Sequence, residues 1–509
     1  MANRLHEQSP SEWQRFQRVI AMAVACITVL FVVALPETPV EAASATTKRV
    51  TKRTPPGKSA PIVRRTIQKS RRAPTTSIST GSTASTVAVP TVTTLPSSSV
   101  TAKPSLPTAP VATTTLVLAA VKAPLPTPAE YLADALQFIE RYWVRRRSVD
   151  VKAITDRARV AGNSARSVAD LYPVLRQAVK ELGDGHSAFL EPAAARSLLE
   201  GTSTGFGLKV YPPDVIFVVP GSPAESAGIR TLDRIVSFNG KPFVATSTAE
   251  RTVDTAVIRV ARSQVGELEF SVRRGELTTA ELPTARPLDA RIGYLDLPGS
   301  TGKPENEQAF AAAGVAVVNS VEQQINPCGW VLDLRRNSGG FPFSMMSALE
   351  PFFPEQSVGG FVYGDDKREQ LRFSAGKVFV ENRAVWTNAA PARLRDPAVP
   401  VAVLTSNLTG SAGEIATIAF IGRPASRSFG TATVGVTSAN VGVRLPDDSF
   451  LMVTHSYDFD RTGKVYDGPI NPDEVVLIDW STFGTAQDPV LNAATGWLGS
   501  HASCVGRTP

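Results

Sequence analysis

The chain is poor in cysteine, with three in 509 residues, and Cys26 lies inside an apolar run. This leaves Cys328 and Cys504 for a folded domain. A disulfide between them would tie the C-terminal tail to the core and would suit an oxidising compartment. Two unrelated thiols are the alternative, because a sequence does not give the distance between them.

Histidine is also scarce, with four in the chain. His6 precedes the apolar run and His501 lies in the C-terminal tail. His186 lies in a glycine-rich turn, ELGDGHSAFL, whereas His455 lies in an apolar strand-like segment, which favours a structural role. A serine nucleophile needs a base such as histidine or a lysine of lowered pKa. His186 is therefore the best-placed base, with an ordinary surface histidine as the alternative.

Acidic residues are absent from residues 48–72, which carry ten Lys and Arg. The formal charge of the chain is +7, so the remainder carries −3 once these ten are removed. The basicity belongs to a tail rather than to a nucleic-acid-binding domain, and we expect no nucleic-acid partner. The tract either binds anionic lipid or wall polymers or is simply solvated.

Long apolar runs are scarce too, and the one that stands out is Val19–Leu35, with 17 uncharged residues. Its length lies between a signal-peptide core and a short membrane span, and residues 43–45 form an A-x-A pattern. Basic residues are more numerous after the apolar run than before it, and the positive-inside rule alone would therefore place the C-terminal part in the cytoplasm. A cleaved signal peptide, however, sets no lasting topology. We expect residues 1–45 to be a signal peptide or membrane anchor, and the protein to be exported to the cell envelope, anchored or secreted.

Residues 46–125 read as a linker, first basic and then rich in Thr, Ser and Pro. Residues 73–116 carry Lys103 as their one charge, and such a composition cannot bury enough apolar surface to fold. We therefore expect a disordered spacer that holds the later domains away from a membrane or wall.

The remainder predicts an α/β, multidomain fold. Residues 126–199 show apolar residues at helical spacing and indicate a small helical domain that ends in the turn bearing His186. Residues 200–287 are β-rich, with turn residues between short apolar runs. In residues 288–509 apolar strands alternate with helices, which is typical of an α/β core followed by a C-terminal tail.

Ser411 lies in TSNLTGSAGEIATIAF, between a strand-like run and an apolar helical run. The N-terminus of a helix offers unpaired N–H groups to a developing oxyanion, which favours a nucleophile. The spacing of Ser411 and Glu414 equally matches a capping box. The segment alone favours the cap.

A second segment, GWVLDLRRNSGG, runs from a buried strand through Asp333–Arg335 into Asn337, Gly339 and Gly340. Glycines let a backbone turn sharply and point N–H groups at a ligand. An ordinary strand-to-helix turn is the alternative.

Together these segments resemble the carboxy-terminal processing, or tail-specific, serine peptidase family, over roughly residues 126–478. The motifs, in family order, are GDGHSAF, a PDZ-like stretch beginning GFGLKV, GWVLDLRRNSGG, TGSAGEIATIAF and DRTGKVYDGPINPD. The resemblance implies an α/β catalytic core, an acyl-enzyme and Ser411 as nucleophile. It also implies an oxyanion hole formed by the N–H of Ala412 and one from Gly339 or Gly340.

Many members of the family carry a lysine about 25 residues after the nucleophile, but that region here reads VGVTSANVGV. The GDGHSAF segment instead resembles the branch that includes the tricorn core and the interphotoreceptor retinoid-binding protein repeats. This branch implies His186 as general base, with Ser187 beside it to orient the ring. Its late glutamate is replaced by Asn471, which could orient an imidazole but could not stabilise an imidazolium by charge.

The PDZ-like stretch resembles domains that receive a peptide C-terminus in a loop of backbone N–H groups. The residues that match this carboxylate-binding loop are Gly205, Phe206, Gly207 and Leu208. A domain that only packs against or gates the core is the alternative.

We therefore expect a serine endopeptidase that acts on protein or peptide substrates, without a metal or an organic cofactor. One rival is a catalytically weak binding protein on the same scaffold, which Asn471 favours. The other is an adaptor at the cell envelope that holds peptide tails through the PDZ-like domain.

Overall fold

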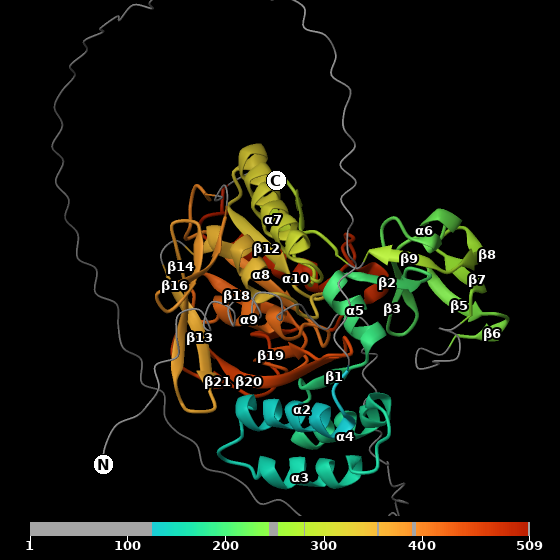
Figure 1. The fold of residues 1–509 in the computed structure, drawn as a ribbon. Helices are drawn as coiled ribbons and strands as arrows, with labels where there is room; N and C mark the ends of the chain where they lie inside the picture. Colours follow the sequence, from blue (N-terminus) through green and yellow to red (C-terminus); the bar gives the residue numbers. More distant parts are fainter. Residues whose placement is uncertain (1–124, 244–252, 279, 354–355, 389–392, 507–509) are drawn as a thin grey trace, which may run out of the picture. The chain divides into compact units, whose positions relative to one another are not determined.

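The computed structural model describes residues 125–506 apart from 244–252, 279, 354–355 and 389–392 (Figure 1). The predicted signal or anchor, the basic tract and the linker lie outside the described residues. Within the described part, no helix is both long and apolar enough to cross a membrane.

The N-terminal helical cluster forms where helical spacing of apolar residues predicts it. It comprises α2 (Pro128–Tyr142), α3 (Val151–Gly162), η1 (Val168–Leu171) and α4 (Tyr172–Leu182). Thr127 and Glu130 close a capping box at the start of α2, and Gly183 ends α4 at φ 68°. A left-handed glycine is a common helix end, because it has no Cβ to clash. α3 was not predicted from the sequence.

The central sheet of the α/β core has the strand order β10-β11-β12-β17-β18-β22 and is parallel except where β10 joins β11. Its strands are β10 (Thr284–Pro287), β11 (Ile292–Asp296), β12 (Gly329–Asp333), β17 (Val401–Thr405), β18 (Ser426–Gly430) and β22 (Glu474–Val475). Every residue of β12 and β17 is buried, as expected for strands covered on both faces. The predicted α/β core is confirmed.

Helices cover both faces of this sheet. They are α7 (Pro304–Ile325), α8 (Pro342–Leu349), η3 (Glu350–Phe352) and α9 (Ala412–Phe420) on one face, and α10 (Pro489–Ser500) on the other. Alternate residues of one strand serve the two faces, since Leu332 packs with α7, α8 and α9 while Val331 packs with α10. A disulfide joins Cys328, just before β12, to Cys504, just after α10, with Cα atoms 5.1 Å apart. It pairs the two cysteines that the sequence analysis considered.

A second sheet, antiparallel throughout, has the order β1-β20-β13-β14-β15-β16, with β19 and β21 also on β20. Its strands are β1 (Ala188–Leu190), β13 (Ser357–Tyr363), β14 (Arg368–Ser374), β15 (Lys377–Val380), β16 (Arg383–Thr387), β19 (Ser438–Arg444), β20 (Phe450–Asp460) and β21 (Val465–Tyr466). The helical cluster packs on β19 and β20 through Val441, Leu451 and Val453. Because β1 follows the His186 turn and pairs with β20, this sheet attaches that turn to the core.

The PDZ-like domain is a sheet of order β3-β4-β5-β7-β8, with β6 on β5. Its elements are β3 (Leu208–Tyr211), β4 (Val215–Val218), α6 (Pro223–Ala227), β5 (Arg234–Phe238), β6 (Lys241–Pro242), β7 (Thr255–Arg262) and β8 (Gly266–Arg273). β2 (Thr202–Gly205) pairs with β9 (Gly275–Thr278), and α5 (Pro192–Glu200) precedes them. Tyr211 stacks on Trp480 of η4 (Trp480–Thr482), with ring centroids 4.6 Å apart.

Candidate active site

Ser411 lies on a sharp turn between β17 and α9. β17 ends at Thr405, and Ser411 is the residue directly before the first helical residue, Ala412. Its backbone has φ 50° and ψ −119°, a region that L residues seldom adopt. Such strain persists only where the surroundings enforce it, and it is concentrated at functional sites.

Glu414 fixes the start of α9. Its carboxylate accepts the N–H of Ser411 at 2.9 Å, the hydroxyl of Thr433 at 2.5 Å and the N–H of Gly435 at 2.8 Å. Burial is the main cause that raises the pKa of Glu414 to about 7, although these donors act in the opposite direction. With these three contacts Glu414 acts as a structural partner of the turn, in accordance with the predicted capping box.

Asn337 connects the glycine turn to the loop before Ser411. Its Oδ1 accepts the N–H of Gly339 at 3.0 Å, and its carbonyl accepts the N–H of Gly410 at 3.0 Å. Its amide nitrogen donates to the carbonyl of Leu297 at 2.9 Å. Asn337 is fully buried, so the two loops are held as one unit.

Glycine is required at both positions of the turn. Gly339 has φ 115°, and a Cβ there would lie 2.8 Å from the Cβ of Ser411. Gly340 has φ 144°, and a Cβ there would lie 2.4 Å from the carbonyl oxygen of Ser300. The turn therefore packs its backbone directly against the candidate nucleophile.

The N–H groups near Ser411 differ in their hydrogen bonding. Gly339 donates its N–H to Asn337. Within the described residues, no hydrogen bond is formed by the N–H of Ala412 or of Gly340. Of the three N–H groups considered from the sequence, these two are available to a ligand.

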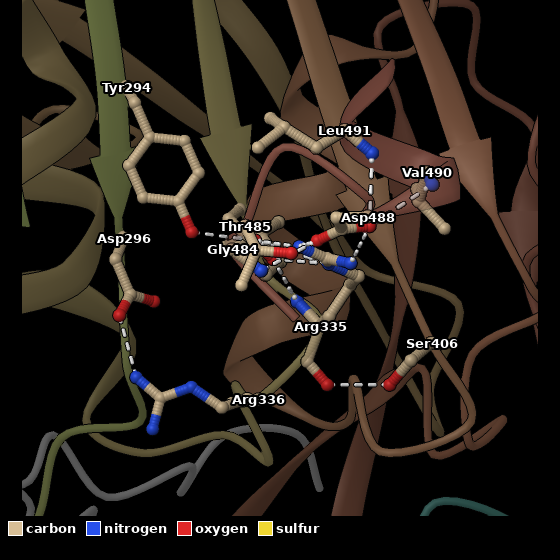
Figure 2. A network of polar contacts seen from close by, with 12 residues as sticks. Tyr294, Asp296, Arg335, Arg336, Ser406, Gly484, Thr485, Asp488, Val490 and Leu491 are labelled. Atoms are coloured by element: carbon tan, nitrogen blue, oxygen red, sulfur yellow. Dashed lines mark hydrogen bonds and ion pairs between the residues drawn. The ribbon is translucent and has the colours of Figure 1, made fainter. Parts of the chain in front are cut away.

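A buried ion-pair network supports the glycine turn (Figure 2). Arg335 is fully buried and binds Asp333 at 2.6 Å and Asp488 at 2.9 Å. Burial alone would raise the pKa of Asp333, but the Arg335 guanidinium outweighs it and lowers that pKa below its usual value. The carbonyl of Arg335 accepts the hydroxyl of Ser406 at 2.5 Å, and Arg336 binds Asp296 at 2.6 Å. These contacts fix the end of β12, where the turn begins.

Asp184 organises the turn that presents His186. Its Oδ1 accepts the N–H groups of His186 and Ser187, at 2.9 and 2.7 Å. Its Oδ2 accepts the Ser187 hydroxyl at 2.6 Å and the indole N–H of Trp143 at 2.9 Å. The Ser187 hydroxyl also accepts the backbone N–H of Thr454 on β20. Its partners are therefore Asp184 and Thr454 rather than the imidazole ring.

The ring of His186 is buried and has one hydrogen-bond partner among the described residues. Its Nδ1 lies 2.8 Å from the hydroxyl of Ser438, at the start of β19. Burial lowers the pKa of His186 to about 4, and the negative charge of Asp184 opposes this shift. The imidazole is therefore neutral at pH 7, the state that a general base needs.

His186 and Ser411 form no hydrogen bond with each other in the described structure. Residues 433–438 connect them: Glu414 holds Thr433 and Gly435 at one end, and Ser438 contacts His186 at the other. We call residues 433–438 the connecting segment.

Asn471 is exposed and lines a cavity of about 560 Å³ beside the C-terminal end of α9, together with Lys464. In the described part of the chain it makes no hydrogen bond to the His186 ring. Lys464 approaches the ring of Tyr466, with 4.7 Å between its Nζ and the ring centroid.

His455 has a structural environment, as the sequence favoured. Its Nδ1 lies 2.8 Å from the carbonyl of Ala439, and its ring meets Tyr363 edge-on. Burial lowers its pKa as well.

Sequence reasoning missed Ser438, Asn337 and Asp184 as partners of the site. Asp184 and Asn337 lie inside the quoted motifs, so their positions were visible although their contacts were not. Ser438 lies in VGVTSANVGV, the region searched for a lysine. In the described residues no cluster of His, Cys, Asp and Glu could hold a metal ion.

The model of peptidase family S41 matches residues 291–476, and a PDZ-domain model matches residues 217–267. The first match contains both the glycine turn and Ser411. The chain contains a peptidase family S41 domain. It is a serine-type peptidase with a PDZ domain.

This S41 peptidase is 28% identical over 284 residues to the nisin-resistance protein of Lactococcus lactis, covering 51% of this chain and 85% of the relative. It is 28% identical over 340 residues to the chloroplastic carboxyl-terminal-processing peptidase 2 of Arabidopsis thaliana, covering 59% and 60%. A solved S41 protease structure from Bacteroides fragilis matches with a TM-score of 0.51 and 20% identity, over 72% of this chain and 96% of that one. This last likeness concerns the fold.

Proposed function

We propose that this S41 peptidase is an endopeptidase that acts through an acyl-enzyme, with Ser411 as nucleophile and His186 as general base. The observation that carries the proposal is the packing of Ser411, in a strained backbone conformation, against the glycine turn at Gly339. A capping serine needs neither this conformation nor a glycine backbone pressed against it.

In the acylation step, the Ser411 hydroxyl gives its proton to Nε2 of His186 while its oxygen bonds to the scissile carbonyl carbon. The negative charge moves to the carbonyl oxygen, which the N–H groups of Ala412 and Gly340 stabilise. When the carbon–nitrogen bond breaks, the imidazolium returns the proton to the leaving amine. Water, deprotonated by the same histidine, then releases the acyl group from Ser411.

The rate of peptide hydrolysis depends on how readily the neutral, buried imidazole accepts a proton. A pKa of about 4 keeps His186 unprotonated at pH 7 but makes it a weak base. Because Asp184 binds backbone N–H groups, Ser187 and Trp143, it contributes charge without binding the ring. We expect a slow peptidase whose active form persists to low pH.

The PDZ domain suits recognition of free C-termini or unstructured tails. β3 is the edge strand of its sheet, so a peptide can pair with it as an added strand. The loop at Gly205–Leu208 leads into this edge. Its carbonyls are engaged, since Phe206 accepts the N–H of Ala224 and Gly207 accepts that of Val219. The loop N–H groups would receive the terminal carboxylate.

We also propose that the protein is exported and works at the cell envelope. The disulfide between Cys328 and Cys504 supports an oxidising compartment. Attachment to a membrane or wall through residues 1–72 is part of the same proposal.

A second candidate is a binding protein, or a weakly active enzyme, on this scaffold. The observation that favours it is the environment of His186, where a neutral serine occupies the place of an orienting carboxylate. The likeness to a nisin-resistance protein favours a short peptide as ligand or substrate.

The experiment compares one unfolded protein and one short peptide, each with a free or an amidated C-terminus. Mass spectrometry should find internal cleavage by the wild type and none by Ser411→Ala. Faster cleavage of the free-carboxylate forms supports tail recognition by the PDZ domain. Binding of either form without cleavage would select the binding-protein alternative.

A further inference from the structure

We propose that Ser438 is the positioning residue for His186, so that the site operates as a Ser411–His186–Ser438 arrangement. The inference rests on the proposed function. Its basis is the contact of 2.8 Å between the Ser438 hydroxyl and Nδ1 of His186. The two side chains are 4% and 7% exposed, so water does not compete for this hydrogen bond.

The direction of this hydrogen bond decides which ring nitrogen can act as base. When Nδ1–H donates to the Ser438 oxygen, the lone pair of Nε2 is free to accept the proton of Ser411. When the Ser438 hydroxyl donates to Nδ1, Nε2 carries the hydrogen and cannot act as base. A hydroxyl supports both tautomers, whereas a carboxylate would favour the first alone. Ser438 thus orients the ring without committing it to one proton position.

The backbone around Ser438 is itself held in place. Its N–H donates to the carbonyl of Val436 at 2.8 Å, and Ser438 pairs with Tyr457 of β20. The turn of His186 is tied to the same strands, because Asn440 donates to the His186 carbonyl at 3.0 Å. The hydroxyl and the ring therefore approach each other from two segments that share one sheet.

The other end of the connecting segment is fixed to the nucleophile. Glu414 binds Ser411, Thr433 and Gly435, and Ser438 follows Gly435 by three residues. The connecting segment thus fixes the position of His186 relative to Ser411. Asn471, the residue that the family resemblance suggested for this role, is exposed and forms no hydrogen bond to the ring within the described residues.

Three variants of the full chain test the inference, with one matched control. Ser438→Ala removes the hydroxyl and should lower kcat about tenfold or more with little change in KM, because ring orientation acts on the chemical step. Ser438→Thr keeps the hydroxyl and should restore most of kcat. Ser438→Asp should strengthen the base and favour the Nδ1–H tautomer.

The control is Ser456→Ala. Ser456 is a buried serine on β20 whose hydroxyl lies 3.3 Å from Nδ1 of His455, a histidine outside the proposed chemistry. Its variant should keep kcat unchanged. Equal kcat values for Ser438→Ala and the wild type would overturn the inference, as would equal losses in Ser438→Ala and Ser456→Ala.

Labelling of the active serine separates this inference from the proposed function. If a fluorophosphonate labels the wild type no faster than Ser411→Ala, the proposed function fails. If it labels Ser411 and does so equally fast in Ser438→Ala, only the role of Ser438 fails. Should the variants not fold, ¹⁵N NMR of the His186 ring in the wild type reports the tautomer directly. A ring hydrogen confined to Nε2 contradicts the inference.

Discussion

Gly339 and Ser411 pack so closely that a Cβ on the glycine would lie 2.8 Å from the Cβ of the serine. The same Cβ would lie 3.0 Å from the carbonyl oxygen of Gly410. Gly339 belongs to the turn after β12, and Ser411 belongs to the turn after β17. Two neighbouring parallel strands thus bring the glycine backbone and the serine together at their carboxyl ends, where α/β sheets carry ligands.

Gly339→Ala should abolish most of the peptidase activity. The new methyl group would press on Ser411, and φ 115° is unfavourable for alanine. We expect kcat/KM to fall about 100-fold or more, the size of effect seen when an oxyanion hole is damaged. Peptide hydrolysis measures the loss, and circular dichroism checks the fold.

Gly221→Ala in the PDZ domain is the control, because Gly221 has φ 73° and no described atom lies within 4 Å of a Cβ built there. It also places an alanine at a positive φ, but without a clash. Activity of Gly339→Ala equal to that of Gly221→Ala would contradict the contact with Ser411.

Asp488→Ala should destabilise the core strongly. Asp488 accepts two hydrogen bonds from the buried guanidinium of Arg335 and caps the start of α10. Removing one partner of a buried ion pair costs about 3–5 kcal/mol. The free energy of unfolding in urea measures the effect.

Asp479→Ala provides the comparison. Asp479 caps η4 through Ser481 but is exposed, so the loss should be about 1 kcal/mol. If the two variants lose the same free energy of unfolding, the effect of Asp488 does not come from its ion pair with Arg335.

Several parts of this fold follow from the sequence alone. The strands β11, β12 and β17 are short apolar runs bounded by polar turns, and α7 and α9 have the length and composition of buried helices. The order of these elements is sufficient to predict the α/β core. Ser411, Gly339 and Gly340 could be selected because their motifs are local.

Other parts depend on long-range contacts that no local pattern records. Ser438 meets His186 across 252 residues, and Asp488 meets Arg335 across 153. The strands from β13 to β16 were missed because glycines and charges interrupt their apolar alternation. Asn471 was chosen by analogy with a motif, and motif order does not establish that a side chain faces the ring.

The contribution of Glu414 to the free energy of unfolding should fall as the pH rises, opposite in sign to that of His186. The pKa of Glu414 is raised from 4.5 to about 7, so its stabilising contribution is complete below pH 4.5 and is lost as the pH passes 7. The change amounts to roughly 3 kcal/mol for this shift. Asp458 adds to it, because burial and the nearby Glu414 raise its pKa and neither of its oxygens has a hydrogen-bond partner among the described residues.

Asp458→Asn should therefore stabilise the protein at pH 8, where the unfolded chain is ionised at this position and burial disfavours that charge in the folded protein. Asp460, two residues along β20, is the opposite case. Although burial raises its pKa, hydrogen bonds from Thr462 and Tyr466 lower it overall, so its contribution is present at pH 8 and lost in acid. Asp460→Asn should destabilise the protein at pH 8. Urea unfolding at pH 5 and pH 8 compares the two variants, and a shift of the same sign in both contradicts this account.

Cys328 and Cys504 should both be unreactive in denatured, unreduced protein that has been secreted. Their disulfide spans 176 residues, and reduction should lower the free energy of unfolding by about 2–5 kcal/mol. Thiol titration and urea unfolding with and without reductant measure both effects. Two free thiols in the secreted protein would exclude the bridge.

The most direct test of the account is labelling with a fluorophosphonate, which reacts with an activated serine. We predict that the wild type is labelled at Ser411, that Ser411→Ala is not labelled, and that His186→Ala is labelled much more slowly. Mass spectrometry of the labelled peptide identifies the residue. Labelling of the wild type no greater than that of Ser411→Ala would contradict the assignment of Ser411 as the nucleophile.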